Sequence, residues 1–70
     1  MKRYRIYFGP CIVQGMAARL MRAGFRVVCI GTENVFIETL ISPENIVTVM
    51  RKRGAAVGLR DIYRVGEVSE

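Results

Sequence analysis

Arginine is the residue in this sequence with the most obvious chemistry. Lysine and arginine total 11 against six acidic residues, and nine of the 11 are arginines. A guanidinium group binds phosphate or carboxylate through paired hydrogen bonds and also stacks on nucleobases. The first acidic residue is Glu33, and the surplus of positive charge before it predicts an anionic partner. The alternative is that the arginines reflect a compositional bias and are simply solvated.

This chain lacks the side chains that most enzyme chemistry needs. The sequence contains no histidine, so the Ser-His-Asp and Cys-His arrangements that activate a nucleophile cannot form. Asp61 is the only aspartate and the glutamates are scattered, so neither a carboxylate pair nor a magnesium site is expected. We therefore expect a protein that is not an enzyme, with no catalytic residue, no cofactor and no metal.

The two cysteines, Cys11 and Cys29, lie in apolar stretches and lack the Cys-x-x-Cys spacing of zinc and redox motifs. We interpret them as buried, reduced thiols, which suits a reducing compartment. The alternative for Cys11 is a nucleophile, because it precedes an expected helix whose N-terminus favours a thiolate.

The segment Val13-Gln14-Gly15, followed by Arg19, could hold a phosphate group. Backbone N–H groups at the start of a helix and one arginine together make a sound phosphate site. The segment resembles the signature of acylphosphatases, a ferredoxin-like family in which Val-Gln-Gly precedes the arginine that holds the substrate phosphate. The resemblance implies a hydrolase with Arg19 as its anchor, although Val28 stands where that family has an asparagine. The alternative is an ordinary amphipathic helix start.

The basic run Arg51-Lys52-Arg53 is a further candidate for phosphate contact. The alternative is the solvated end of a helix, where cations complement the negative end of the helix dipole.

Four strands are expected from short runs rich in alternating, β-branched and aromatic residues. They cover residues 3–8, 25–30, 35–41 and 61–68, and the turn residues at 31–34 predict a hairpin between the second and the third. The alternation directs toward the core Tyr4, Ile6 and Phe8 of the first strand, Val35, Ile37, Thr39 and Ile41 of the third, and Tyr63 and Val65 of the last.

Two helices are expected between these strands. The first carries apolar residues at positions 13, 16, 17 and 20 and stops at Gly24. The second opens with Ser42 as its N-cap and Pro43 at its first position, and it closes at Gly54. Its buried stripe should be Ile46, Val49 and Met50.

The order strand-helix-strand-strand-helix-strand predicts the fold class. It is an α+β, ferredoxin-like sandwich over residues 1–70 as a single domain, with a four-stranded antiparallel sheet and two helices on one face. The first and third strands should lie in the centre.

The uncovered face of this sheet is the first candidate for binding. It should present Arg3, Arg5 and Tyr7 from the first strand, Arg26, Val28 and Ile30 from the second, and Phe36, Glu38 and Leu40 from the third. Aromatic rings stack on bases while arginines contact phosphates, so the face suits single-stranded nucleic acid.

The same arrangement resembles the RNA-recognition-motif family, which shares the order of elements and places stacking aromatics on its two central strands. Ile6-Tyr7-Phe8 and Val35-Phe36-Ile37 stand where that family has its two motifs, and the resemblance implies RNA binding. We expect Arg3, Arg5, Tyr7, Arg26, Phe36 and Leu40 to contact the partner. The alternative is a protein partner, either a larger protein that this chain regulates or a second copy in a homodimer. Phe36, Leu40, Val28 and Ile30 would form the core of the homodimer contact.

No run of about 18 apolar residues exists to span a membrane. Tyr4-Arg5 interrupts what would otherwise be the apolar core of a signal peptide. We therefore expect no membrane partner and a cytoplasmic location.

Overall fold

The computed structural model describes residues 1–58 and 61–68. Its elements run in the order β1 (Lys2–Phe8), α1 (Val13–Arg22), β2 (Arg26–Ile30), β3 (Asn34–Thr39), η1 (Pro43–Asn45), α2 (Ile46–Lys52) and β4 (Ile62–Glu67). The four strands form one antiparallel sheet in the order β2-β3-β1-β4, with β1 and β3 in the centre as predicted.

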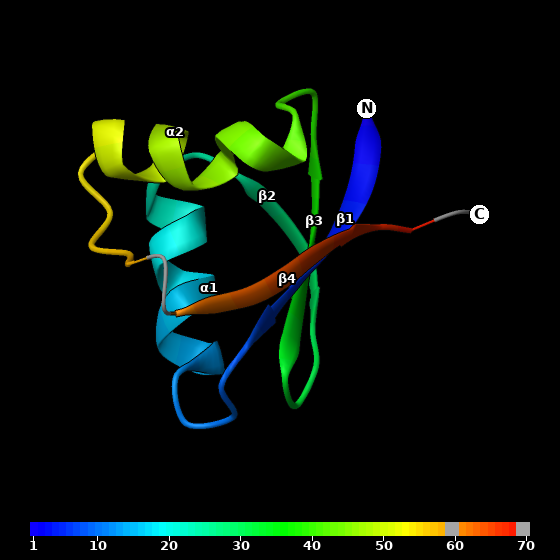
Figure 1. Ribbon diagram of the computed structural model, residues 1–70, viewed down its shortest axis with the longest axis vertical. Helices are drawn as coiled ribbons and strands as arrows, with labels where there is room; N and C mark the ends of the chain where they lie inside the picture. Colours follow the sequence, from blue (N-terminus) through cyan, green and yellow to red (C-terminus); the bar gives the residue numbers. More distant parts are fainter. Residues whose placement is uncertain (59–60, 69–70) are drawn as a thin grey trace.

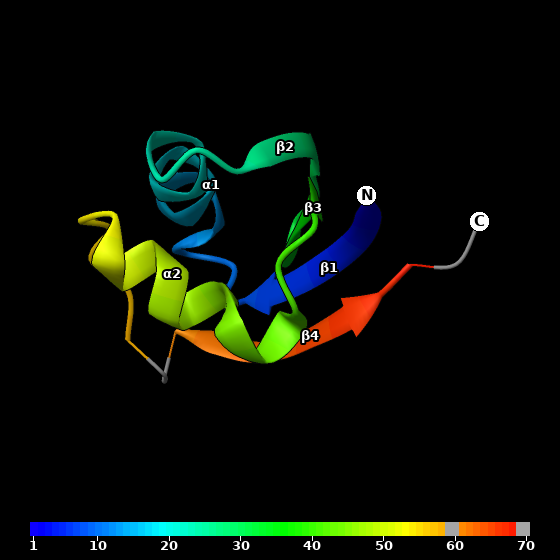
Figure 2. The same ribbon diagram turned by 90° about the horizontal axis from the view of Figure 1, so that it is seen from above.

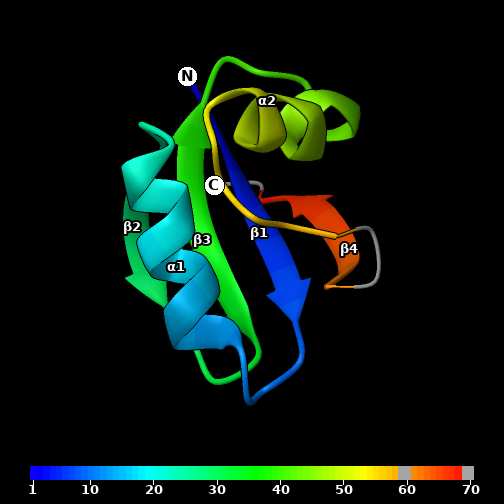
Figure 3. The same cartoon turned by 90° about the vertical axis from the view of Figure 1, so that its left-hand side faces the viewer.

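Both helices lie on the same side of this sheet. Figure 1 and Figure 2 show them together on one face, with no described element over the other. Figure 3 looks onto the helix side, where α1 lies in front of β2 and β3, and α2 lies toward β1 and β4. The predicted ferredoxin-like α+β fold is confirmed, and the arrangement leaves one sheet face open.

Strict alternation in the two central strands builds the core. Tyr4, Ile6 and Phe8 of β1 are buried, and so are Val35, Ile37 and Thr39 of β3. Arg3, Arg5 and Tyr7 lie between the buried residues of β1 and are only half-buried, because they face the open side. The side-chain directions predicted for β1 and for these β3 residues are therefore confirmed.

The helices cover the core with the predicted apolar stripes. Val13, Met16, Ala17 and Leu20 are buried in α1, and Ile46 and Met50 are buried in α2, whereas Val49 is only partly buried against the core. Gly24 and Gly54 follow the two helices with φ of 87°, a left-handed conformation that glycine adopts without strain.

The predicted cap of the second helix is wrong in one respect. The Ser42 side chain makes no capping hydrogen bond, and its carbonyl oxygen accepts from the Asn45 N–H at 2.9 Å. This bond closes a short 3₁₀ turn, η1, so α2 begins only at Ile46. The β-branched residues of 46–49 still form a helix, because the apolar stripe is buried against the sheet.

A β-bulge corrects the prediction for β2. The register pairs Val27 with Ile37 and then Cys29 with Phe36, so Val28 is the extra residue. Directly paired residues share a face, which turns Cys29 to the open side and Ile30 to the core side. Ile30 is therefore not on the open face, contrary to the prediction.

Four further residues have an assigned direction in the predicted strands. Leu40 lies beyond the end of β3 and is 84% exposed, and Ile41 follows it as a partly buried residue outside the strand. Val65 packs against the core as predicted. The side chain of Tyr63 lies outside the described residues.

The prediction of two buried thiols is wrong. Cys11 and Cys29 are both exposed and free. Cys11 lies in the turn before α1, and the bulge in β2 turns Cys29 outward.

Candidate functional site

The open face of the sheet collects side chains from all four strands. Direct pairing places Arg5 beside Phe36, Tyr7 beside Arg64, and Arg26 beside Glu38. Tyr7 and Phe36, the two rings on which the predicted stacking surface depends, both face this side and are half-buried. We call this surface the open face; its described members are Arg3, Arg5, Tyr7, Arg26, Cys29, Asn34, Phe36, Glu38, Arg64 and Gly66.

Guanidinium groups and rings alternate across the centre of the open face. The guanidinium carbon of Arg64 lies 4.5 Å from the centroid of the Tyr7 ring. That of Arg5 lies 5.9 Å from the same ring and 4.7 Å from the Phe36 ring. Each such contact contributes about 0.5–1 kcal/mol at an exposed site. We call the row Arg64–Tyr7–Arg5–Phe36, which crosses β4, β1 and β3, the ladder.

The ladder also changes the acidity of its tyrosine. Arg5 Nη1 donates to the Tyr7 hydroxyl oxygen at 2.9 Å. Hydrogen bonding from Arg5, and next from Arg64, lowers the pKa of Tyr7 below its ordinary value of 10.0. The cause is that both cations favour the phenolate.

Glu38 is the acidic residue of the open face, and two arginines flank it. Arg3 Nη2 lies 3.3 Å from Glu38 Oε2, and Arg26 Nε lies 3.3 Å from Glu38 Oε1. Four arginines, including Arg5 and Arg64, therefore stand against one carboxylate among the described members of the open face. The negative charge of Glu38 is more than balanced, and the face is positive overall.

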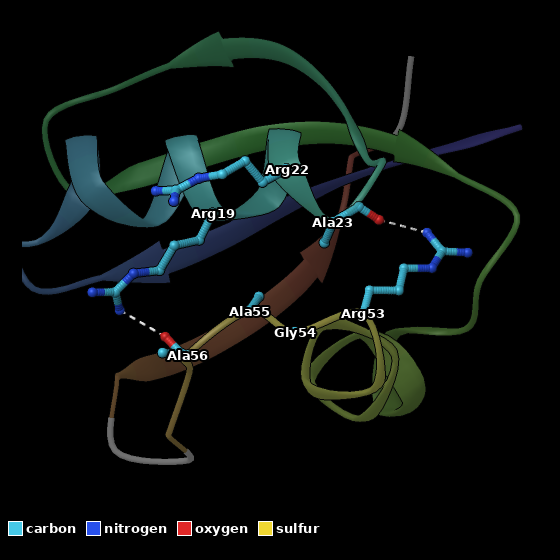
Figure 4. Close-up of a pocket in the computed structure, with 7 residues that line it drawn as sticks. All are labelled: Arg19, Arg22, Ala23, Arg53, Gly54, Ala55 and Ala56. Carbon is cyan, nitrogen blue, oxygen red and sulfur yellow. Dashed lines mark hydrogen bonds between the residues drawn. The ribbon is translucent and has the colours of Figure 1, made fainter.

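The basic residues predicted for phosphate contact lie on the other side of the molecule, and three of them bind backbone. Arg19 Nη1 donates to the Ala56 carbonyl oxygen at 2.6 Å, and Arg53 Nη1 donates to the Ala23 carbonyl oxygen at 2.7 Å. Figure 4 shows these two bonds on opposite sides of a cleft of about 420 Å³. Arg51 Nε donates to the Val57 carbonyl oxygen at 2.8 Å.

These three bonds hold the helices and the following loop together. Arg53 lies just after α2, and its side chain reaches the end of α1. There its guanidinium also lies 5.6 Å from the Phe25 ring. Carbonyl oxygens at helix C-terminal ends lack intrahelical partners, so arginine donors satisfy them directly. Lys52 and Arg22 are exposed, and Arg22 lines the cleft. What distinguishes Arg19, Arg51 and Arg53 is therefore their hydrogen bonds to backbone and not their burial, since Arg51 and Arg53 are exposed as well.

The Val13-Gln14-Gly15 segment forms the first turn of α1, with Gln14 and Gly15 exposed. Arg19 lines a hollow of about 230 Å³ with Cys11, Gly15 and Asp61, but its Nη1 is directed to Ala56. The Arg19 side chain therefore lies toward the start of α1, and its hydrogen bond connects α1 to the loop at Ala56.

Sequence reasoning missed Arg64 and Gly66. The prediction that Val65 points inward already implies that its two neighbours point outward, and this signal was sufficient to find them. The pairing of Tyr7 with Arg64 and of Arg5 with Gly66 places both beside the ladder.

Within residues 1–58 and 61–68, no helix has both the length and the apolar character that crossing a membrane requires. Histidine, cysteine and carboxylate side chains do not gather in threes anywhere in these ranges, so they offer no metal-ligand cluster. Comparison of the chain with protein-family models, with curated proteins and with solved structures gave no match.

Proposed function

We propose that this protein is a non-enzymatic module that binds single-stranded nucleic acid on the open face of its sheet. The observation that carries the proposal is the ladder, in which two guanidinium groups alternate with two rings across three neighbouring strands. Stacked planes and cations on one surface suit a flexible chain of bases and phosphates.

The energies favour exchange of a ladder contact for a base. A cation–π contact at an exposed site contributes about 0.5–1 kcal/mol. A base stacked on an aromatic side chain contributes about 1–3 kcal/mol. A base that displaces Arg64 from the Tyr7 ring therefore gains more than it removes, and the freed guanidinium can reach a phosphate.

The charge and the distribution of apolar residues favour nucleic acid over self-association. Among the described residues, the large hydrophobic side chains classed as exposed are Met1, Met21, Val28 and Leu40, and of these only Val28 lies in the sheet. The homodimer core predicted from Phe36, Leu40, Val28 and Ile30 is scattered, because Arg5 covers Phe36 and Ile30 faces the core side. A positive face without an apolar patch suits a polyanion better than a second copy of itself.

Fluorescence anisotropy with labelled oligouridine and oligothymidine of about ten nucleotides tests the proposal. We expect both to bind at low salt and to dissociate as salt is added, because binding releases counterions. Tyr7→Leu combined with Phe36→Leu should weaken binding at fixed salt while leaving the fold intact, because leucine keeps most of the packing.

Arg22→Gln is the matched control for Arg64→Gln. Each variant removes one positive charge, and the two residues lie on opposite sides of the molecule. The substitution on the open face should weaken binding more. Equal effects of the two, or no binding of either oligonucleotide at low salt, would overturn the proposal. A doubled mass in light scattering that Phe36→Arg abolishes would support the homodimer instead.

A further inference from the structure

A hollow of about 280 Å³ lies beside the ladder, at the outer edge of the open face. Its lining residues include Arg5, Tyr7, Arg64 and Gly66. β4 is an edge strand, so the hollow has one side toward solvent. Small-molecule pockets have volumes of about 300–1,000 Å³, and this hollow is just below that range, the size for one flat ring system.

The hollow exists because β4 has no side chain at residue 66. A Cβ atom built on Gly66 would meet nothing within 4 Å, so neighbouring atoms do not require glycine there. Its φ is not positive either, because the positive-φ glycines of the described chain are Gly24 and Gly54. Glycine weakens a strand interior and often marks the close approach of a ligand. With no steric or conformational reason for it, this glycine keeps a space open.

The groups around the hollow are mainly hydrogen-bond donors. Arg5 uses Nη1 for the Tyr7 hydroxyl, while its Nε is buried and has no acceptor. Arg64 lies over the Tyr7 ring. Glu67 also lines the hollow, but its pairing with Tyr4 directs its side chain to the other side of the sheet, where its carboxylate lies 3.7 Å from Lys2 Nζ. A ligand with two adjacent acceptors on one edge complements the two arginines.

We propose that this hollow receives a single guanine base and gives the protein a preference for guanine within single-stranded nucleic acid. The inference rests on the proposed function. Guanine presents the acceptors O6 and N7 side by side, which arginine binds in bidentate fashion. Adenine presents a donor at N6 beside N7, and uracil has no two adjacent acceptors on one edge.

Three oligouridines of about ten nucleotides test the preference: one all-uridine, one with a central guanine and one with a central adenine. We expect the guanine oligonucleotide to bind roughly tenfold more tightly than the all-uridine one, which corresponds to about 1.4 kcal/mol. Adenine should give no comparable gain. Gly66→Ile fills the hollow with a residue that favours strands, so the guanine-to-uridine affinity ratio should fall to about one.

Lys52→Ala, remote from the hollow on the helix side, should keep the tenfold ratio and serves as the matched control. Gly66→Val replaces the isoleucine variant if the latter melts at a lower temperature. A ratio near one in the wild type, or a ratio that Gly66→Ile leaves unchanged, overturns the guanine site while all-uridine binding still supports the proposed function. Absence of binding to all three oligonucleotides at low salt overturns both.

Discussion

The arginines of the open face and those beside the helix ends use the same guanidinium group differently. On the helix side, Arg19, Arg51 and Arg53 donate to backbone carbonyl oxygens at 2.6–2.8 Å. On the open face, Arg5 and Arg64 lie over the Phe36 and Tyr7 rings, which the proposed function assigns to bases. A backbone carbonyl is a fixed partner, whereas a ring on an open face is an exchangeable one. Substitutions on the helix side should therefore change stability, and those on the open face should change binding.

Arg53→Ala should have the largest effect of the variants that test this division. It leaves the Ala23 carbonyl oxygen without its charged donor and uncovers the Phe25 ring. Hydrogen bonds to charged groups contribute about 1.5–3 kcal/mol, and partial exposure of Arg53 reduces this to about 1–2 kcal/mol. A domain of this size loses about 4–8 °C of melting temperature per kcal/mol, so thermal unfolding should shift down by roughly 10 °C.

Lys52→Ala is the control for Arg53→Ala, because it removes one charge from the neighbouring exposed position. Its stability should stay within about 0.5 kcal/mol of the wild type. Equal melting temperatures for the two variants would contradict the structural role of Arg53.

Arg5→Gln should show the opposite pattern. It removes the guanidinium that lies between Tyr7 and Phe36 in the ladder and also one positive charge. Affinity for oligouridine should fall roughly tenfold, since stacking and a phosphate contact are both lost. The melting temperature should fall less than for Arg53→Ala, because glutamine can still donate to the Tyr7 hydroxyl and pack on the Phe36 ring, so only part of two cation–π contacts of about 0.5–1 kcal/mol each is lost.

The comparison of Arg5→Gln with Lys52→Ala separates the ladder from net charge. Both variants lose one positive charge, measured at the same salt concentration in the anisotropy titration. If their affinities were equal, the ladder would contribute nothing beyond its charge.

The sequence was enough to predict the fold and the direction of the open-face rings. Alternation in residues 3–8 determines which side chains of the first strand are buried. Each helix has one apolar stripe, so both helices pack on the apolar face of the sheet and the other face stays open. The bulge at Val28 could not be predicted from the sequence, because its position depends on the pairing of β2 with β3 and not on β2 alone. That pairing turned Ile30 inward and Cys29 outward.

The roles of the basic residues were beyond the sequence for a similar reason. Arg19 and Ala56 are 37 positions apart, and Arg53 and Ala23 are 30 positions apart. No local sequence pattern predicts that such a pair will be in contact. An arginine that binds backbone and an arginine that lies on the open face therefore look the same in a sequence. The exception is Arg64, whose direction follows from that of its neighbour Val65.

Glu38→Gln should sharpen the comparison by making the open face more positive. It removes the carboxylate that Arg3 and Arg26 flank at 3.3 Å. Surface ion pairs contribute about 0.2–1 kcal/mol, so stability should change little. Oligouridine affinity should rise roughly threefold and fall more steeply with added salt, because two arginines become available to phosphates. Weaker binding would mean that Glu38 holds the arginines in their binding positions.

Raising the pH should produce the smallest effect, with opposite signs for binding and stability. Because Arg5 and Arg64 lower the pKa of Tyr7, its phenolate forms below the ordinary value of 10.0 in the folded chain. The folded state therefore gains stability as pH rises through the lowered pKa toward about 10, and loses that gain as pH falls through it. Oligouridine binding should weaken over the same range by roughly twofold, because the phenolate repels phosphates. Tyr7→Phe should remove both changes, and Arg5→Gln should move the Tyr7 titration, followed by near-ultraviolet absorbance, to higher pH. If Arg5→Gln left the Tyr7 titration unchanged, the contact between Arg5 and Tyr7 in the ladder would be contradicted, since the hydrogen bond from Arg5 is the largest cause of the lowered pKa.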